Sequence, residues 1–132
     1  MTEEPEFLRL EEVLAFHEQQ MALWGGDPGV RDSNALGAAL GMPSQGFGEE
    51  YFHPTLFLMA AAYAFHIAQG QPFLDGNKRT GLNCAVSFLG LNGIFIHDPA
   101  SLLAAAVLGF SDGSVDKAAF ATLLEGLAVA PP

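Results

Sequence analysis

The sequence predicts an all-α protein, a single domain spanning residues 1–132 and built as a bundle of about six helices. Apolar residues recur at helical spacing along almost the whole chain, and no segment shows sustained alternation of apolar and polar residues. Half of the residues are hydrophobic, which is enough for a real core and rules out disorder as the default state. The only cysteine, Cys84, excludes an intramolecular disulfide, so we expect a reducing compartment and a fold held by packing.

Glycine and proline mark the ends of the first two helices. A first helix is expected over 10–24, stopped by Gly25 and Gly26. A loop rich in Gly and Pro follows, and Asp32 or Ser33 can cap a short second helix that ends at Pro43. The connection over 44–54 carries Gly and aromatic residues and is compatible with some extended structure. The apolar face of the first helix consists of Leu10, Val13, Leu14, Met21 and Trp24.

Proline, glycine and asparagine also indicate where the remaining helices begin and end. Pro54 suits the first turn of a third helix that runs to about Gln69, and Asn92-Gly93 stops a fourth that begins near Asn77. A fifth helix is expected over 97–110 and a sixth over 114–127, before a Pro-Pro tail. The third and fourth helices are the most apolar pair and are rich in Ala and Gly. We therefore expect them to pack closely at the centre of the bundle.

The charge of the chain excludes two classes of partner. Fifteen acidic residues against five Lys and Arg give a net charge of −10, so there is no basic surface for direct nucleic-acid binding or for an anionic membrane. The stretch "MTEEPEFLRLEE" is acidic where a secretory signal would be basic. The most apolar stretch, "PTLFLMAAAYAFHIAQG", has the length of a buried helix rather than a membrane span. We expect a soluble cytoplasmic protein.

Two of the five cations stand where a helix disfavours them. Lys78 and Arg79 follow the Gly76-Asn77 turn, at the positive end of the fourth helix. Backbone N–H groups at a helix N-terminus reached through a glycine turn form an anion site, and a guanidinium grips phosphate oxygens bidentately. Asp75 adds a hard oxygen ligand suited to Mg²⁺, which accompanies nucleoside polyphosphates. The residues alone thus predict a phosphate site, with solvated or acid-paired surface cations as the alternative.

The stretch "QPFLDGNKRTGL" closely resembles the central motif of the Fic/Doc family, which reads His-Pro-Phe-x-Asp-Gly-Asn-Lys-Arg-Thr-Ala in its Doc-like toxin branch. The resemblance continues in "WGGDPGVRDSNALGAALGMP", "MAAAYAFHIAQGQPF" and "FLGLNGIFI", and so covers most of the chain. It implies a small all-helical Fic fold, with ATP or another nucleoside triphosphate and Mg²⁺ as cofactors. It also implies an antitoxin partner and a protein target, typically part of the translation machinery.

The resemblance assigns roles to the motif residues one by one. Asp75 would coordinate Mg²⁺, while Gly76, Asn77 and the amides that follow would form the anion nest. Arg79 would bind the nucleotide phosphates. Lys78 stands where adenylylating relatives usually carry Gly, and in Doc-like members this substitution accompanies kinase activity, with phosphate rather than AMP transferred to a hydroxyl.

One motif position departs from the family. The general base is a histidine, and here that position is Gln71, whose amide has no basic site to accept the hydroxyl proton. The chain as written should therefore be nearly inert in the family reaction. Two explanations stay open: a histidine replaced deliberately to make a toxic protein expressible, or a natural variant that binds nucleotide or a partner without catalysis.

The histidines and the cysteine are expected mainly in structural or supporting roles. The four histidines show no zinc-binding spacing, so His66 is expected in a core or supporting role, with substrate contact a minority hypothesis for His53. Cys84 is expected to be a buried packing residue. The family's autoinhibitory motif is absent, since "ATLLEG" has Ala121 at the required hydroxyl position. Restraint would then come from a separate antitoxin. The aromatic residues expected in the core are Trp24, Phe57 and Phe88.

Overall fold

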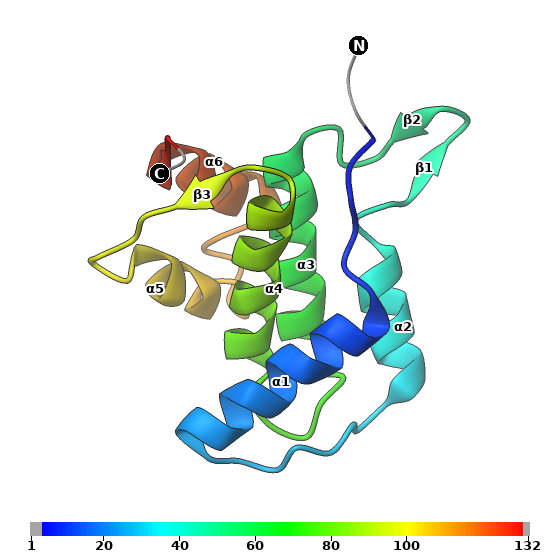
Figure 1. Ribbon diagram of the computed structural model, residues 1–132, viewed down its shortest axis with the longest axis vertical. Helices are drawn as coiled ribbons and strands as arrows, with labels where there is room; N and C mark the ends of the chain where they lie inside the picture. The colour runs from blue at the N-terminus through cyan, green and yellow to red at the C-terminus, as the bar shows by residue number, and fades with distance from the viewer. Residues whose placement is uncertain (1–3, 131–132) are drawn as a thin grey trace.

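Two helices run side by side through the middle of the protein in its computed structural model, which describes residues 4–130 (Figure 1). These are α3 (Leu56–Gly70) and α4 (Asn77–Leu91), and α3 holds the most extensively buried face of the molecule. Their backbones approach closely at Gly81, where an added Cβ would lie 2.8 Å from the carbonyl oxygen of Ala64. This confirms the expectation of a close central pair.

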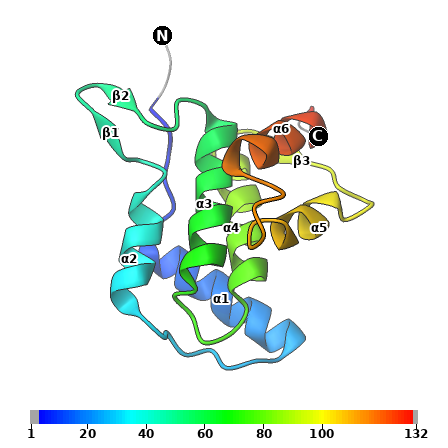
Figure 2. The same cartoon turned by 180° about the vertical axis from the view of Figure 1, so that it is seen from behind.

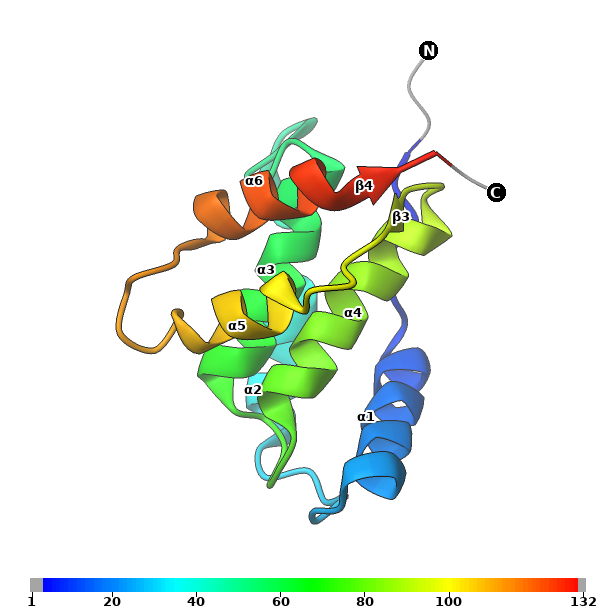
Figure 3. The same cartoon turned by 90° about the vertical axis from the view of Figure 1, so that its left-hand side faces the viewer.

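Four further helices cover this pair from different sides. α1 (Leu10–Trp24) lies across α4, and α2 (Ser33–Gly41) packs on α3 (Figure 1). Seen from behind, α6 (Lys117–Leu127) also rests on α3 (Figure 2). The short α5 (Leu102–Leu108) packs between α4 and α6 (Figure 3). The described residues thus form an all-α bundle of six helices, as the sequence predicts.

The strands are only two residues long. β1 (Gly46–Phe47) and β2 (Glu50–Tyr51) form an antiparallel hairpin in the connection that was expected to hold some extended structure. β3 (Phe95–Ile96) pairs with β4 (Ala128–Val129) and joins the end of α4 to the end of α6. The β1–β2 hairpin lies near the N-terminal end of α3, whereas the α3–α4 loop lies at its other end (Figure 1).

Several helix starts differ from the prediction because side chains cap them. Thr55 accepts the amide of Leu58, so α3 begins at Leu56 and Pro54 precedes the helix rather than occupying its first turn. Asp98 accepts the amides of Leu102 and Leu103, which delays α5 well beyond residue 97. Asp116 caps α6 in the same way, through the amide of Ala119. The Pro-Pro tail lies outside the described residues.

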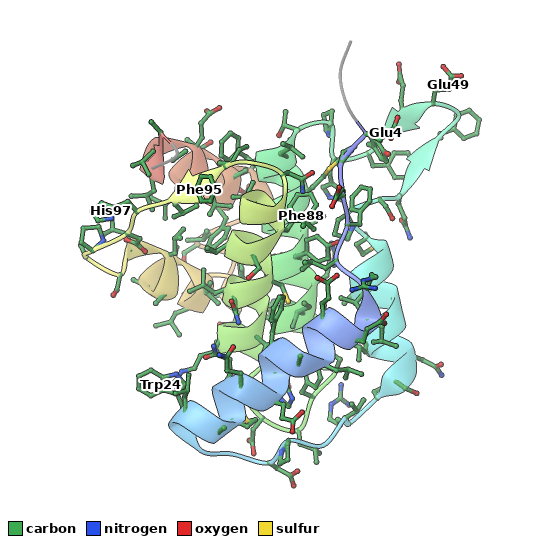
Figure 4. The ribbon with its side chains drawn as sticks, in the orientation of Figure 1. Glu4, Trp24, Glu49, Phe88, Phe95 and His97 are labelled. Carbon is green, nitrogen blue, oxygen red and sulfur yellow. The ribbon has the colours of Figure 1, made fainter. Side chains whose placement is uncertain are left out.

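The buried face of α1 differs from the predicted one. Val13, His17 and Met21, spaced four residues apart, are buried. Leu10 and Leu14 are exposed, and Trp24 is 63% exposed at the end of the helix, so its assignment to the core is wrong (Figure 4). The two other aromatic predictions fare better.

Phe88 is fully buried, and Phe57 is partly buried against the core. Cys84 is buried as expected, and burial raises the pKa of its thiol to about 12. A thiol that stays protonated is a packing group rather than a nucleophile. None of the helices in residues 4–130 is long and apolar enough to cross a membrane.

Candidate anion-binding site at the α3–α4 loop

The loop between α3 and α4 contains two left-handed residues, one at each end. Gln71 ends α3 with φ 48° and ψ 54°, and Gly76 precedes α4 with φ 76°. Within the loop, the Asn77 side chain donates to the carbonyl of Phe73 and accepts its amide, both at 3.0 Å. The first residue of α4 thereby fixes the middle of the loop, and the first amides of the helix have no partner within it.

A second loop, residues 25–32, pairs with this one along an edge. The amides of Arg31 and Asp32 both donate to the carbonyl of Pro72, at 2.8 and 3.0 Å. The amide of Leu74 returns a bond of 3.0 Å to the carbonyl of Gly29. Val30 and Phe73 form a bridge between these bonds. The α3–α4 loop is therefore shaped by a segment about forty residues earlier in the chain.

Asp75 is also oriented by the 25–32 loop. Its Oδ2 accepts the amide of Asp27 at 2.8 Å, and the Asp27 carboxylate in turn accepts the amide of Gly29 at 2.9 Å. Gly26 leaves room for this contact, because an added Cβ at position 26 would lie 3.1 Å from the Cβ of Asp75. The φ of Gly26 is 123°, a backbone conformation that favours glycine. One carboxylate oxygen of Asp75 is thus anchored while the side chain remains exposed.

His17 supports the same loop from beneath. It is 1% exposed, its ring stacks on Phe73 with centroids 3.7 Å apart, and its Nε2 lies 2.7 Å from the carbonyl oxygen of Asp75. A carbonyl only accepts, so Nε2 carries the hydrogen in this bond. Met21, the next buried residue of α1, lies against Gly76.

A cavity of about 420 Å³ opens at the start of α4. Its lining brings together all of the site residues that the sequence predicts: Gln71, Asp75, Gly76, Asn77, Lys78 and Arg79. Met21, Gly25, Ala68 and Leu74 complete the wall. The carboxylate, the glycine turn and the two cations therefore share one space.

Neither cation of the motif is paired with an acid. Among residues 4–130, the ion pairs join Arg9 to Glu11 and Glu12 and involve neither Lys78 nor Arg79. The guanidinium of Arg79 instead lies 4.4 Å from the centroid of the Trp24 ring. Figure 4 shows Trp24 at the outer end of α1, away from the core. The structure thus gives no support to the acid-paired alternative.

Asp75 is suited to Mg²⁺ only in company with a ligand. No group of three or more His, Cys, Asp and Glu side chains that could hold a metal occurs in the described part of the chain. Mg²⁺ commonly binds through one or two carboxylates, the phosphates of a substrate and water. A single exposed carboxylate beside Lys78 and Arg79 fits that mode, and it does not fit a site made by protein ligands alone.

Two histidines converge on a lysine away from this cavity. The Nζ of Lys117 on α6 lies 3.1 Å from Nε2 of His53 and 3.0 Å from Nε2 of His66. Burial, and then the nearby Lys117 charge, lowers the pKa of His66 to about 4, and the same causes lower the pKa of His53. Burial also lowers the pKa of Lys117. His66 thus ties α3 to α6, and neither histidine lines the cavity.

Sequence reasoning missed three residues that hold the site: His17, Asp27 and Arg31. His17 had a signal, because it continues the four-residue spacing of Val13 and Met21 along α1. Asp27 and Arg31 lie in a loop whose composition indicates turns. Nothing in that composition shows that the amide of Asp27 binds the Asp75 carboxylate or that Arg31 binds the carbonyls at the end of α3.

The fold and the site define a small all-α protein whose two central helices are joined by a loop with a glycine turn and a cationic helix start. The sequence pattern described as "Fic/DOC family" matches residues 7–89, and the chain belongs to this family. The chain is similar to "Protein kinase doc" of Escherichia phage P1, with 33% identity over 117 residues, covering 89% of this chain and 91% of that protein. It is also similar to "Toxin Doc" of Mycolicibacterium smegmatis (strain ATCC 700084 / mc(2)155), with 35% identity over 89 residues, covering 67% of this chain and 66% of that protein.

Proposed function

We propose that the protein is a Doc-like toxin whose site transfers phosphate, or AMP, from ATP to a protein hydroxyl and is disabled by Gln71. The observation that carries this proposal is the single cavity lined by Asp75, the Gly76 turn, Lys78 and Arg79. The similarity to proteins named Protein kinase doc and Toxin Doc supports the choice of reaction class.

The site supplies binding and orientation for a triphosphate. The unpaired amides at the start of α4 bind phosphate oxygens, and Lys78 and Arg79 add the charge that these oxygens require. Mg²⁺ held by Asp75 and by the phosphates would neutralise further negative charge. Phosphoryl transfer depends chiefly on such positioning and charge stabilisation.

Transfer also needs a base. In the kinase version, the target hydroxyl oxygen bonds to the γ-phosphorus, the bond from that phosphorus to the bridging oxygen breaks, ADP leaves, and the hydroxyl proton must be taken up. Gln71 lines the cavity at the position of the family histidine, but its amide cannot accept this proton.

The described histidines offer no substitute. None of the four, His97 included, lines the cavity. His17 is bonded to the carbonyl of Asp75, while His53 and His66 face Lys117. We therefore expect the protein to bind nucleotide without turning it over. Lys78 favours phosphate over AMP as the transferred group, as it does in Doc-like relatives.

The proposal includes a partner and a compartment. A Doc-like toxin acts in the cytoplasm on a protein target, for which the translation machinery is the candidate class, and is restrained by a cognate antitoxin. A second candidate function rests on Gln71 itself: a non-catalytic protein that uses the cavity to hold a nucleotide or a partner would need no base at this position.

Restoring the base tests the proposal. Gln71→His should raise the rate of labelled phosphate or AMP transfer from ATP to lysate proteins by about 10²-fold or more, with little change in nucleotide affinity. The variant should also arrest growth unless an antitoxin is co-expressed, whereas the Gln71 protein is tolerated. If Gln71→His labels nothing in several lysates and is harmless to its native host, the toxin proposal fails and the binding function takes its place.

A further inference from the structure

Arg31 reaches across to the end of α3 and bonds two successive backbone carbonyls. Its Nε donates to the carbonyl of Gln71 at 2.6 Å and its Nη2 to the carbonyl of Gly70 at 3.0 Å. The backbone of Arg31 lies on the same segment, since its amide binds the carbonyl of Pro72. One residue of the 25–32 loop thus contacts three consecutive residues, 70–72, at the point where α3 ends and the α3–α4 loop begins.

These carbonyls lie where a helix leaves its acceptors unused. The last helical bond of α3 runs from the amide of Gln71 to the carbonyl of Ile67. The carbonyls beyond Ile67 have no following turn to bind them, and the end of a helix carries partial negative charge. A guanidinium offers several coplanar N–H donors and a permanent positive charge, so one arginine side chain can donate to two carbonyls at this helix end.

Residue 71 needs such support because its backbone is left-handed without being glycine. A φ of 48° is uncommon for a residue with a side chain, and such residues persist only where the surroundings hold them. This conformation turns the chain out of α3 and places the Gln71 side chain on the cavity wall.

We propose that Arg31 is a positioning residue for the α3–α4 loop: by bonding the carbonyls of Gly70 and Gln71 it holds residue 71 in the conformation that directs its side chain into the cavity. Arg31 does not line the cavity and acts through residue 71. The effect of Arg31 on the rate of transfer rests on the proposed function, because it requires a base at position 71. Its effect on the backbone conformation of residue 71 does not.

The first experiment uses the protein as it is and needs no activity. Backbone chemical shifts of residues 70 and 71, measured by NMR, report whether residue 71 is left-handed. Arg31→Ala should move these shifts away from left-handed values, and Arg31→Lys should move them less, since an ammonium bonds one carbonyl more readily than two. Arg9→Ala, which removes another exposed arginine, is the control and should leave them in place.

Unchanged shifts in Arg31→Ala would overturn the proposal. Should Arg31→Ala fail to fold, Arg31→Lys decides, and unchanged shifts there overturn it equally. A left-handed residue 71 in both variants would mean that the loop keeps its shape without the guanidinium.

The second experiment measures catalysis in the Gln71→His background. Adding Arg31→Ala should lower kcat by about 10-fold or more, because small displacements of a reacting group cost that much, while KM for nucleotide changes by less than about twofold. Arg31→Lys should recover part of kcat. A parallel rise in KM, or an unchanged kcat, contradicts the positioning role. If Gln71→His itself transfers nothing, the proposed function fails, while the chemical shifts still decide the role of Arg31.

Discussion

The Nε2 of His17 on α1 and the carbonyl oxygen of Asp75 in the α3–α4 loop lie 2.7 Å apart, although 58 residues separate them in the chain. His17→Phe keeps an aromatic ring against Phe73 but removes the hydrogen-bond donor. We expect it to lower the free energy of unfolding by about 1–3 kcal/mol, the usual penalty for an unsatisfied polar group. Urea unfolding checks this, and a loss below the error of the measurement would show that water replaces the imidazole.

Arg79 is the cation on which phosphate binding should depend most. Arg79→Ala is expected to weaken ATP–Mg²⁺ binding by about 1.5–3 kcal/mol, the range for hydrogen bonds to charged groups. Calorimetric titration measures the difference, with Arg9→Ala as a matched removal of one positive charge far from the cavity. Equal affinity of the Arg79→Ala and unsubstituted proteins would make Arg79 a surface residue that merely stacks on Trp24.

Gly81 and Gly90 give a matched pair of substitutions on α4. An alanine Cβ at position 81 would lie 2.8 Å from the backbone oxygen of Ala64, whereas at position 90 it would meet nothing within 4 Å. Gly81→Ala should therefore destabilise the protein by about 1–3 kcal/mol, as overpacked sites do. Gly90→Ala should stabilise it by up to about 1 kcal/mol through helix propensity. Thermal unfolding of both variants compares them, and an equal gain in the two would disprove the close contact.

The contact of His53 and His66 with Lys117 should make stability depend on acid pH. The pKa of His66 falls from 6.5 to about 4 on folding, so between these values the unfolded chain binds more protons than the folded one. The contribution is present in full above about pH 6.5 and is lost as the pH falls towards about 4. His53, whose pKa is also lowered, adds to the loss in the same direction.

His66→Gln tests this pH dependence. Glutamine can still accept a hydrogen bond from Lys117 but does not titrate, so the fall of stability between pH 6.5 and 4 should be shallower than in the unsubstituted protein. Urea unfolding at a series of pH values measures the slope. Parallel curves for the two proteins would contradict the prediction.

The sequence predicts the fold well because the spacing of apolar residues and the glycines at helix ends determine helices from neighbouring residues alone. The helices α3 and α4 end within a residue or two of their expected ends, and the close approach at Gly81 follows from small residues on both helices. α3 begins at Leu56, later than Pro54 suggests, because Pro54 is compatible with a helix start but Thr55 provides the cap.

The candidate site was predicted only for its contiguous part. Residues 71–79 are neighbours in sequence, so a motif can indicate that they act together. Arg31 and His17 act on backbone carbonyls, which every residue possesses, and their targets become visible only in three dimensions. The assignment of Trp24 to the core is wrong for a related reason. An apolar residue at the last turn of α1 is buried only if a neighbouring segment covers it, and the sequence does not show whether one does.

Trp24 is the only tryptophan in the 132 residues, and its ring lies under the guanidinium of Arg79, a residue that lines the cavity. Indole emission responds to a cation held against the ring, so the intrinsic fluorescence of the protein is sensitive to the position of the Arg79 guanidinium. A ligand that draws the guanidinium towards its own phosphates should change that emission without any label. This change in emission should be absent in Trp24→Phe, which has no indole. Anion titrations of this protein can therefore be followed by its own tryptophan fluorescence, with Trp24→Phe as the control.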